Sequence, residues 1–183
     1  MGMPAPASYY TADMVRALPD DGNRYETVHG ELLVSPSPRL LHQLVLGRLH
    51  RTLGDYLEPE RIGALLFSPA DISWGPDTLV QPDLFVAAYH EARTMDWARV
   101  QTLLLAVEIL SPSSVRADRF TKRRLYQEQA IPTYWIVDAD QRQVGVWTPA
   151  ALFPVVAHDR LHWQPAGASR TCVIELEELF RPL

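Results

Sequence analysis

The sequence has almost no cysteine and no long apolar run, and both absences exclude classes of protein. Its one cysteine, Cys172, cannot form an intramolecular disulfide or supply a cysteine-based zinc site, so we expect a reducing, cytoplasmic compartment. The most apolar internal run, residues 103–110, is interrupted by Glu108 and is too short to span a bilayer. Residues 1–10 contain no basic segment followed by an apolar stretch, so we expect neither secretion nor membrane insertion.

Positive charge is also scarce, and arginine supplies nearly all of it. The chain has 22 acidic and 17 basic side chains, and its formal net charge is −5. This balance argues against a protein that coats nucleic acid by bulk attraction, so any such binding needs a local basic surface. Lys122 is the only lysine. Coding bias accounts for most of this preference, but the one retained lysine marks a place where a compact ammonium has a use.

The composition is that of an ordinary globular protein, with 47% hydrophobic and 21% charged residues among 183. We expect one domain over 1–183, with residues 1–10 as a loose tail. Its pattern of apolar and turn-forming residues predicts a short helix over 11–18, a hairpin over 25–34 with its turn at His29-Gly30, a long amphipathic helix over 41–57, strands over 64–67, 71–74, 83–87 and 102–110, a second helix over 115–129, strands over 133–137 and 144–147, and a closing turn over 175–180. Strands before and after two helices, with a fully buried strand between them, predict an α/β (α+β) fold with a mixed sheet flanked by helices.

Two acidic residues lie at the ends of predicted strands. Asp83 follows Pro82 at the start of one strand, where a turn-capping role is the simpler interpretation. Glu108 lies near the end of the buried strand. Because an unpaired carboxylate is costly to bury, Glu108 should meet a cation, a metal ion or solvent at the strand end.

The helix predicted over 115–129 carries most of the local positive charge. Its basic residues outnumber its two acids, Asp118 and Glu128, and are Arg116, Arg119, Lys122, Arg123 and Arg124. A solvated charged face is the simplest interpretation of this composition. However, Arg119, Lys122 and Tyr126 share one face, and Asp118 can pair with Lys122 four residues later.

Together these residues match the needs of metal-assisted phosphodiester cleavage. Asp83 and Glu108 supply hard oxygen ligands for Mg²⁺ or Mn²⁺, to which we add a main-chain carbonyl near Ile109. Lys122 supplies an ammonium near the attacking water or the scissile phosphate. Arg119 and Arg123 are the expected contacts to backbone phosphates.

Several stretches of the sequence resemble one known family. They are RYETVHGELLVSPSPRLLHQ, VQPDLFV, LAVEILSPSSVRADRFTKRRLYQEQAIPTYWIVD and VGVW. The resemblance covers residues 25–147, which is most of the chain. Their joint spacing is similar to the Uma-two family of restriction-endonuclease-like proteins, within the PD-(D/E)XK nuclease superfamily. The resemblance implies a restriction-endonuclease-like core and metal ligation by Asp83 and Glu108. Leu110 stands where the superfamily has its lysine, and the resemblance implies that Lys122 takes over that role.

Two further residues match family positions, and they are weaker candidates. Glu31 in the hairpin is a possible additional acidic site residue. His42 on the long helix is a possible accessory site residue, against the alternative of a helix-surface or core histidine.

The sequence therefore favours a Mg²⁺- or Mn²⁺-dependent endonuclease that acts on nucleic acid, with DNA as the expected substrate and a homodimer as one possible assembly. A second hypothesis is a catalytically silent nucleic-acid- or protein-binding domain that retains the nuclease fold. The acidic net charge counts against tight, non-specific nucleic-acid binding. A third is a small α/β protein with one charged helix and no site.

Overall fold

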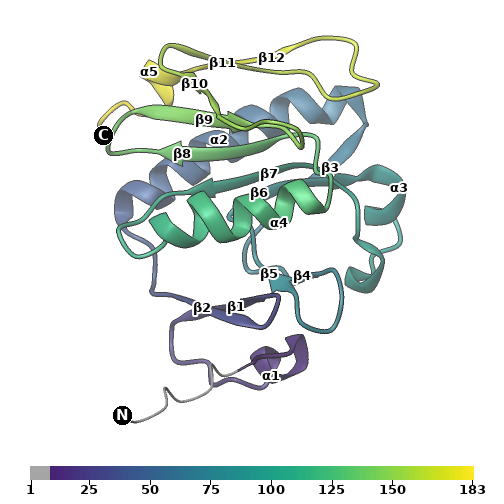
Figure 1. Ribbon diagram of the computed structural model, residues 1–183. Coiled ribbons are helices and arrows are strands. Elements are labelled where there is room, and N and C mark those ends of the chain that lie inside the picture. The colour runs from purple at the N-terminus through teal and green to yellow at the C-terminus, as the bar shows by residue number, and fades with distance from the viewer. Residues whose placement is uncertain (1–8) are drawn as a thin grey trace.

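A six-stranded mixed sheet forms the centre of the computed structural model, which describes residues 9–183 (Figure 1). The strand order is β10 (Val155–Ala157), β9 (Gln143–Trp147), β8 (Tyr134–Asp138), β7 (Leu103–Ile109), β6 (Leu84–Ala88) and β3 (Gly63–Phe67). Only β7 and β8 pair in parallel among these neighbours, with Ala106 opposite Tyr134 and Ile109 opposite Val137. A parallel pair needs a crossover connection, and the helical segment after β7 supplies it.

Helix α2 (Leu40–Glu60) covers one face of this sheet, and it confirms the long helix predicted over 41–57. Val45, Leu49 and Leu53 recur every four residues, so they lie on one side of the helix, where all three are fully buried. They pack in a cluster with side chains of β6, β7 and β8. In Figure 1, α2 passes behind the sheet.

The opposite face is covered by a helical segment that differs from the prediction. Instead of one α-helix over 115–129, the chain forms a π-helix (Ala117–Lys122) that continues directly into α4 (Arg123–Glu128). Leu125 and Tyr126 of α4 are buried against the sheet, and α4 lies in front of it in Figure 1. The wide i→i+5 turns of a π-helix alter the helical phase, and Asp118 and Lys122 are both buried within this segment.

A smaller sheet lies below the first in Figure 1. Its order is β2 (Glu31–Ser35), β1 (Arg24–Val28), β5 (Leu79–Val80) and β4 (Ile72–Ser73). The predicted hairpin is confirmed, because β1 and β2 are joined by His29 and Gly30, whose φ angles are 50° and 82°. Positive φ at both central residues is the signature of a tight hairpin turn whose twist suits the strands. Helix α1 (Ala12–Arg16) precedes this sheet and is capped by Thr11, as predicted.

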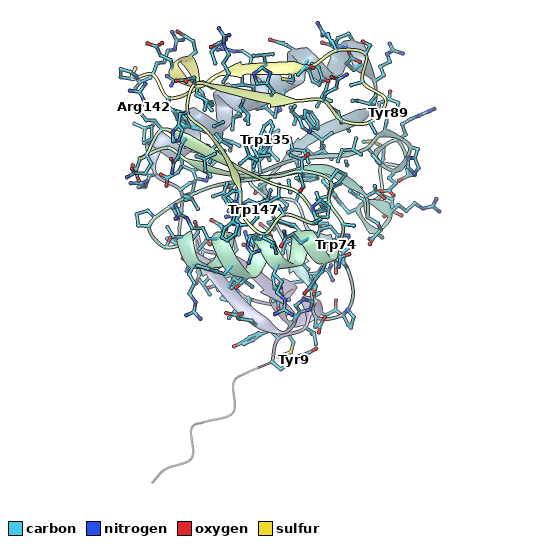
Figure 2. All side chains as sticks on the ribbon, turned by 45° about the horizontal axis from the view of Figure 1, so that its top comes forward. Tyr9, Trp74, Tyr89, Trp135, Arg142 and Trp147 are labelled. Carbon is cyan, nitrogen blue, oxygen red and sulfur yellow. The ribbon has the colours of Figure 1, made fainter. Side chains whose placement is uncertain are left out.

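Three of the remaining elements pack in the same core cluster as α2, and they are β11 (Arg160–Trp163), β12 (Cys172–Glu175) and α5 (Leu176–Leu179). Helix α3 (Tyr89–Ala92) follows β6 and contacts β3, and a 3₁₀ helix (Trp97–Arg99) contacts β4. Trp135 of β8 is fully buried, 6.0 Å from the Trp163 ring, and Figure 2 shows it in the interior.

The N-terminal segment predicted to be a loose tail lies mostly outside the described residues, which begin at Tyr9. Tyr9 and Tyr10 do not fit that prediction. The Tyr9 hydroxyl donates to Asp77 at 2.5 Å, and the Tyr10 N–H donates to the Gly30 carbonyl at 3.0 Å. These two bonds fix the start of the described chain to the hairpin and to the loop before β5.

Candidate active site

A buried polar cluster lies where β1, β6 and β7 approach the N-terminal part of α2 and the π-helix. It brings together residues that are far apart in the sequence, and we define it as Arg24, Glu26, His42, Asp83, Glu108, Asp118, Lys122 and Tyr126. Asp83 comes directly before β6, and Glu108 is the sixth residue of β7. Both expected metal ligands therefore belong to this one cluster.

Asp83 connects three elements through both of its oxygens. Oδ1 accepts a hydrogen bond from Nη1 of Arg24 at 2.7 Å. Oδ2 accepts one from the Ile109 N–H at 2.8 Å and lies 3.0 Å from Nε2 of His42. Burial acts to raise the pKa of Asp83, but the His42 hydrogen bond and the Arg24 charge outweigh it and hold the pKa well below its usual range. Asp83 is thus an ionised carboxylate that joins β1, α2 and β7, which goes beyond the turn-capping interpretation.

Glu108 is fully buried and points to the α4 side of the sheet. Its Oε1 accepts hydrogen bonds from Nζ of Lys122 at 3.0 Å and from the Tyr126 hydroxyl at 2.9 Å. Its other oxygen, Oε2, is buried and has no hydrogen-bond partner among the described residues. Complete burial raises the pKa of Glu108 well above its usual value; Lys122 opposes this shift, and the nearby charge of Asp118 adds to it.

Lys122 lies at the centre of the acidic residues and is only 1% exposed. Its ammonium is 2.8 Å from Oε2 of Glu26, 3.0 Å from Oε1 of Glu108 and 3.6 Å from Oδ1 of Asp118. Burial acts to lower the pKa of Lys122, but these carboxylates outweigh it and raise the pKa above its ordinary value. The solvated-face interpretation is therefore wrong for Lys122, whose ammonium points into the protein.

The cluster carries more negative than positive charge. Four carboxylates surround one ammonium and one guanidinium, and they belong to Glu26, Asp83, Glu108 and Asp118. Burial raises the pKa of Asp118 to about 6, with Lys122 opposing the shift. The charges of Asp83 and Glu26 add to the burial effect on the pKa of Asp118, and a divalent cation would relieve this excess of negative charge.

The residues present therefore fit a hard divalent cation by charge and by donor chemistry. Asp83 and Glu108 provide carboxylate oxygens, and the Oε2 atom of Glu108 is an oxygen without a protein partner among the described residues. Within residues 9–183, no group of three or more His, Cys, Asp and Glu side chains is arranged to hold a metal ion. Water or main-chain oxygens would have to complete the coordination, as is usual for Mg²⁺. For Ile109 the structure shows the N–H bonded to Asp83, and its carbonyl as a ligand stays a prediction.

A cleft of about 640 Å³ opens onto the Asp83 side of the cluster. Arg24, His42, Asp83 and Ile109 are among its lining residues, together with Ser111. A ligand in this cleft would reach Asp83 before Glu108 or Lys122, because Asp83 is among the lining residues and the other two are not.

Sequence reasoning missed two members of the cluster. Glu26 is two residues before the buried Val28 on β1, so strand alternation places both side chains on the core side, and that signal could have found it. Arg24, at the start of β1, carries no comparable local signal. Glu31, a possible accessory residue by family resemblance, is exposed at the start of β2 opposite Val28, so the structure does not bring it into the cluster. His42 does join, through Asp83.

The two expected phosphate contacts, Arg119 and Arg123, lie on the outer side of the helical segment. Arg119 donates from Nη2 to Asp138 at 3.0 Å. Arg123 donates from Nε to the Arg119 carbonyl at 3.0 Å, and its guanidinium lies 4.8 Å from the Trp147 ring centroid. Figure 2 shows Trp147 beside α4. Both guanidinium groups thus have partners within the protein.

The sequence matches the model of a known protein family over most of its length. The sequence model of the Uma2 (Uma-two) family, described as "Putative restriction endonuclease", matches residues 12–168. The chain belongs to this family. A search of curated proteins found no match.

A solved structure shares the fold of this family member. It is the crystal structure of "a putative nuclease belonging to DUF820" from Anabaena variabilis ATCC 29413. The two chains are 22% identical, with a TM-score of 0.77 over 93% of this chain and 97% of the other. This likeness confirms the restriction-endonuclease-like fold that the sequence predicted. None of the helices described in residues 9–183 combines the length and apolarity needed to cross a membrane.

Proposed function

We propose that this Uma2 family member is a metal-dependent endonuclease that hydrolyses phosphodiester bonds, with DNA as its substrate. The observation that carries the proposal is the position of Lys122, whose ammonium lies 3.0 Å from Oε1 of Glu108 within the cluster that also contains Asp83. Two strand-end carboxylates can hold a divalent ion for metal-assisted phosphodiester hydrolysis, and a lysine beside them can stabilise the charge that develops. The family description supports the same reaction class.

Asp83 and Glu108 would hold the Mg²⁺ or Mn²⁺ ion, with the Ile109 carbonyl as a further oxygen ligand. When bound, such an ion stabilises negative charge on a phosphoryl oxygen and lowers the pKa of a water molecule. The contacts of Asp83 Oδ2 with His42 and with the Ile109 N–H fix the orientation of the Asp83 carboxylate. The hydrogen bond from the Tyr126 hydroxyl does the same for Glu108.

Lys122 would stabilise the negative charge that develops on the reacting oxygen atoms. Glu26 and Glu108 hold its ammonium at 2.8 and 3.0 Å, so the charge is oriented before the reaction begins. Such preorganised charges typically contribute a few kcal/mol, or about a hundredfold or more in rate. Leu110 is apolar and buried, so the lysine reaches the site from the π-helix rather than from β7. Glu26 is a positioning residue, because it acts through Lys122.

Cleavage of supercoiled plasmid and of single-stranded DNA with added Mg²⁺ or Mn²⁺ tests this function. The paired substitutions Asp83→Asn and Glu108→Gln keep side-chain size and remove both ligand charges. We expect this double variant to lose at least about a hundredfold in cleavage rate and to lose Mn²⁺ binding in isothermal titration.

Asp140→Asn is the matched control, because Asp140 is exposed and pairs with Arg39 outside the cluster. We expect this variant to retain both properties. Equal Mn²⁺ affinity in the wild type and the Asp83→Asn, Glu108→Gln variant would refute the metal site.

A further inference from the structure

Arg24 is the cation that faces the cleft at Asp83. Its Nη1 donates to Asp83 Oδ1 at 2.7 Å and also to Ser68 Oγ and the Gln81 carbonyl, both at 3.2 Å. Its Nε lies 3.8 Å from Oε2 of Glu26. The Arg24 side chain is 22% exposed and lines the cleft, whereas the Lys122 side chain is 2% exposed.

The two oxygens of Asp83 are not equally available to a metal ion. Oδ2 already accepts the Ile109 N–H and lies against His42, and these partners belong to β7 and to α2. Oδ1 is bound by the side chain of Arg24, which is long and partly exposed. A guanidinium cannot lose its charge in a protein, so Arg24 cannot yield its place by deprotonation. A divalent cation and Arg24 therefore compete for the lone pairs of Oδ1. The two positive charges also repel each other.

We propose that Arg24 is a competing counter-ion of Asp83: a divalent cation displaces its guanidinium, which then binds a backbone phosphate of the nucleic acid in the cleft. This inference rests on the proposed function and adds a residue to its substrate contacts. The two other acceptors of Nη1 are neutral oxygens at 3.2 Å, which are weaker partners than a carboxylate. A guanidinium fork matches phosphate oxygens in a bidentate way, so a phosphate is a suitable replacement for the carboxylate.

The proposal predicts opposite effects of one substitution on two ligands. Arg24→Gln removes the competing charge, so Mn²⁺ should bind about tenfold more tightly or better in isothermal titration, since a unit charge a few ångströms away is only partly screened. The same variant loses a phosphate contact, so KM for an oligonucleotide at saturating Mn²⁺ should rise about tenfold. A merely structural role for Arg24 would instead weaken both interactions.

Arg16→Gln is the matched control. Arg16 lines the same cleft, but it pairs with Asp13 at 2.9 Å and with Asp71 at 3.5 Å rather than with the cluster. Its removal changes the net charge by the same amount, and we expect Mn²⁺ affinity to stay within about twofold of wild type, since exposed and distant charges are screened.

Arg24→Lys is the second variant, and it decides the question if Arg24→Gln does not fold. It keeps the positive charge, so its Mn²⁺ affinity should stay within about threefold of wild type while KM rises. An Arg24→Lys protein that bound Mn²⁺ about tenfold more tightly would overturn the proposal, as would an Arg24→Gln protein that bound it no more tightly than wild type. If wild type binds Mn²⁺ and Arg24→Gln changes nothing, only this inference fails. If neither the wild type nor Arg24→Gln binds Mn²⁺, both this inference and the proposed function fail.

Discussion

Replacing Lys122 with methionine removes the only ammonium from a buried group of carboxylates, so its effect on stability can be estimated from the structure. The ammonium lies within 3.6 Å of Glu26, Glu108 and Asp118, and all of these side chains are almost fully buried. Breaking one buried ion pair by removing a partner costs about 3–5 kcal/mol. We expect Lys122→Met to lie in this range. For a chain of this size, that corresponds to a fall in Tm of about 6–20 °C.

The penalty should depend on pH in a defined direction. The pKa of Asp118 is already raised to about 6 with the ammonium present, and burial raises the pKa of Glu108 as well. Without Lys122 both folded-state pKa values rise further, while the unfolded-state pKa values stay at about 4. The folded state then binds more protons than the unfolded state, so the free energy of unfolding falls as pH rises through this window. The loss of stability should therefore be larger at pH 8 than at pH 5.

Urea denaturation of wild type and variant at both pH values measures this difference. Adding Glu26→Gln to Lys122→Met removes an acid that lost its partner, and it should recover about 1–3 kcal/mol as a coupling energy. Arg124→Met is the control, because Arg124 lies on the same helical segment but is largely exposed and pairs with Glu128. We expect its stability to stay close to that of wild type. Equal penalties for Lys122→Met at pH 5 and pH 8 would refute the role of Lys122 as a buried counter-ion. If the folded Lys122→Met, Glu26→Gln variant still cleaves DNA at the wild-type rate, the Lys122 ammonium has no catalytic role.

Three other sets of contacts lead to further predictions. Asp118→Asn should stabilise the protein at pH 8 by about 3 kcal/mol, because it removes an acid whose pKa rises from 3.8 to about 6 on folding, and the gain should vanish below about pH 4 in denaturation experiments. The double substitution Arg119→Gln, Arg123→Gln should weaken DNA binding and reduce the slope of log K against log salt by about 1.5–2, whereas an unchanged slope would place the phosphate contacts elsewhere. Gly30→Ala should lower stability by about 1–2 kcal/mol in thermal unfolding, because Gly30 has φ of +82° and an added Cβ would meet the Tyr9 ring; a neutral effect would contradict that geometry.

Local pattern was sufficient for much of the fold. The four-residue spacing of Val45, Leu49 and Leu53 predicted α2, because apolar side chains at that spacing share one side of a helix. The aliphatic run of β7 predicted a strand buried on both faces, and His29-Gly30 predicted the hairpin turn. In each case the deciding residues lie within one element, so short-range periodicity carries the information.

Only the tertiary structure decided how the site is composed. Arg24 and Asp83 are 59 residues apart, and no local pattern indicates that this arginine pairs with that acid. Glu26 rather than Glu31 enters the cluster because the hairpin places Glu26 over Lys122 and leaves Glu31 exposed beside the turn. The sequence predicts a helix over 115–129 but not the π-helix within it, in which Asp118 and Lys122 are buried. Burying charge is favourable only when each charge finds a partner, and those partners come from strands and helices that meet only in the folded chain.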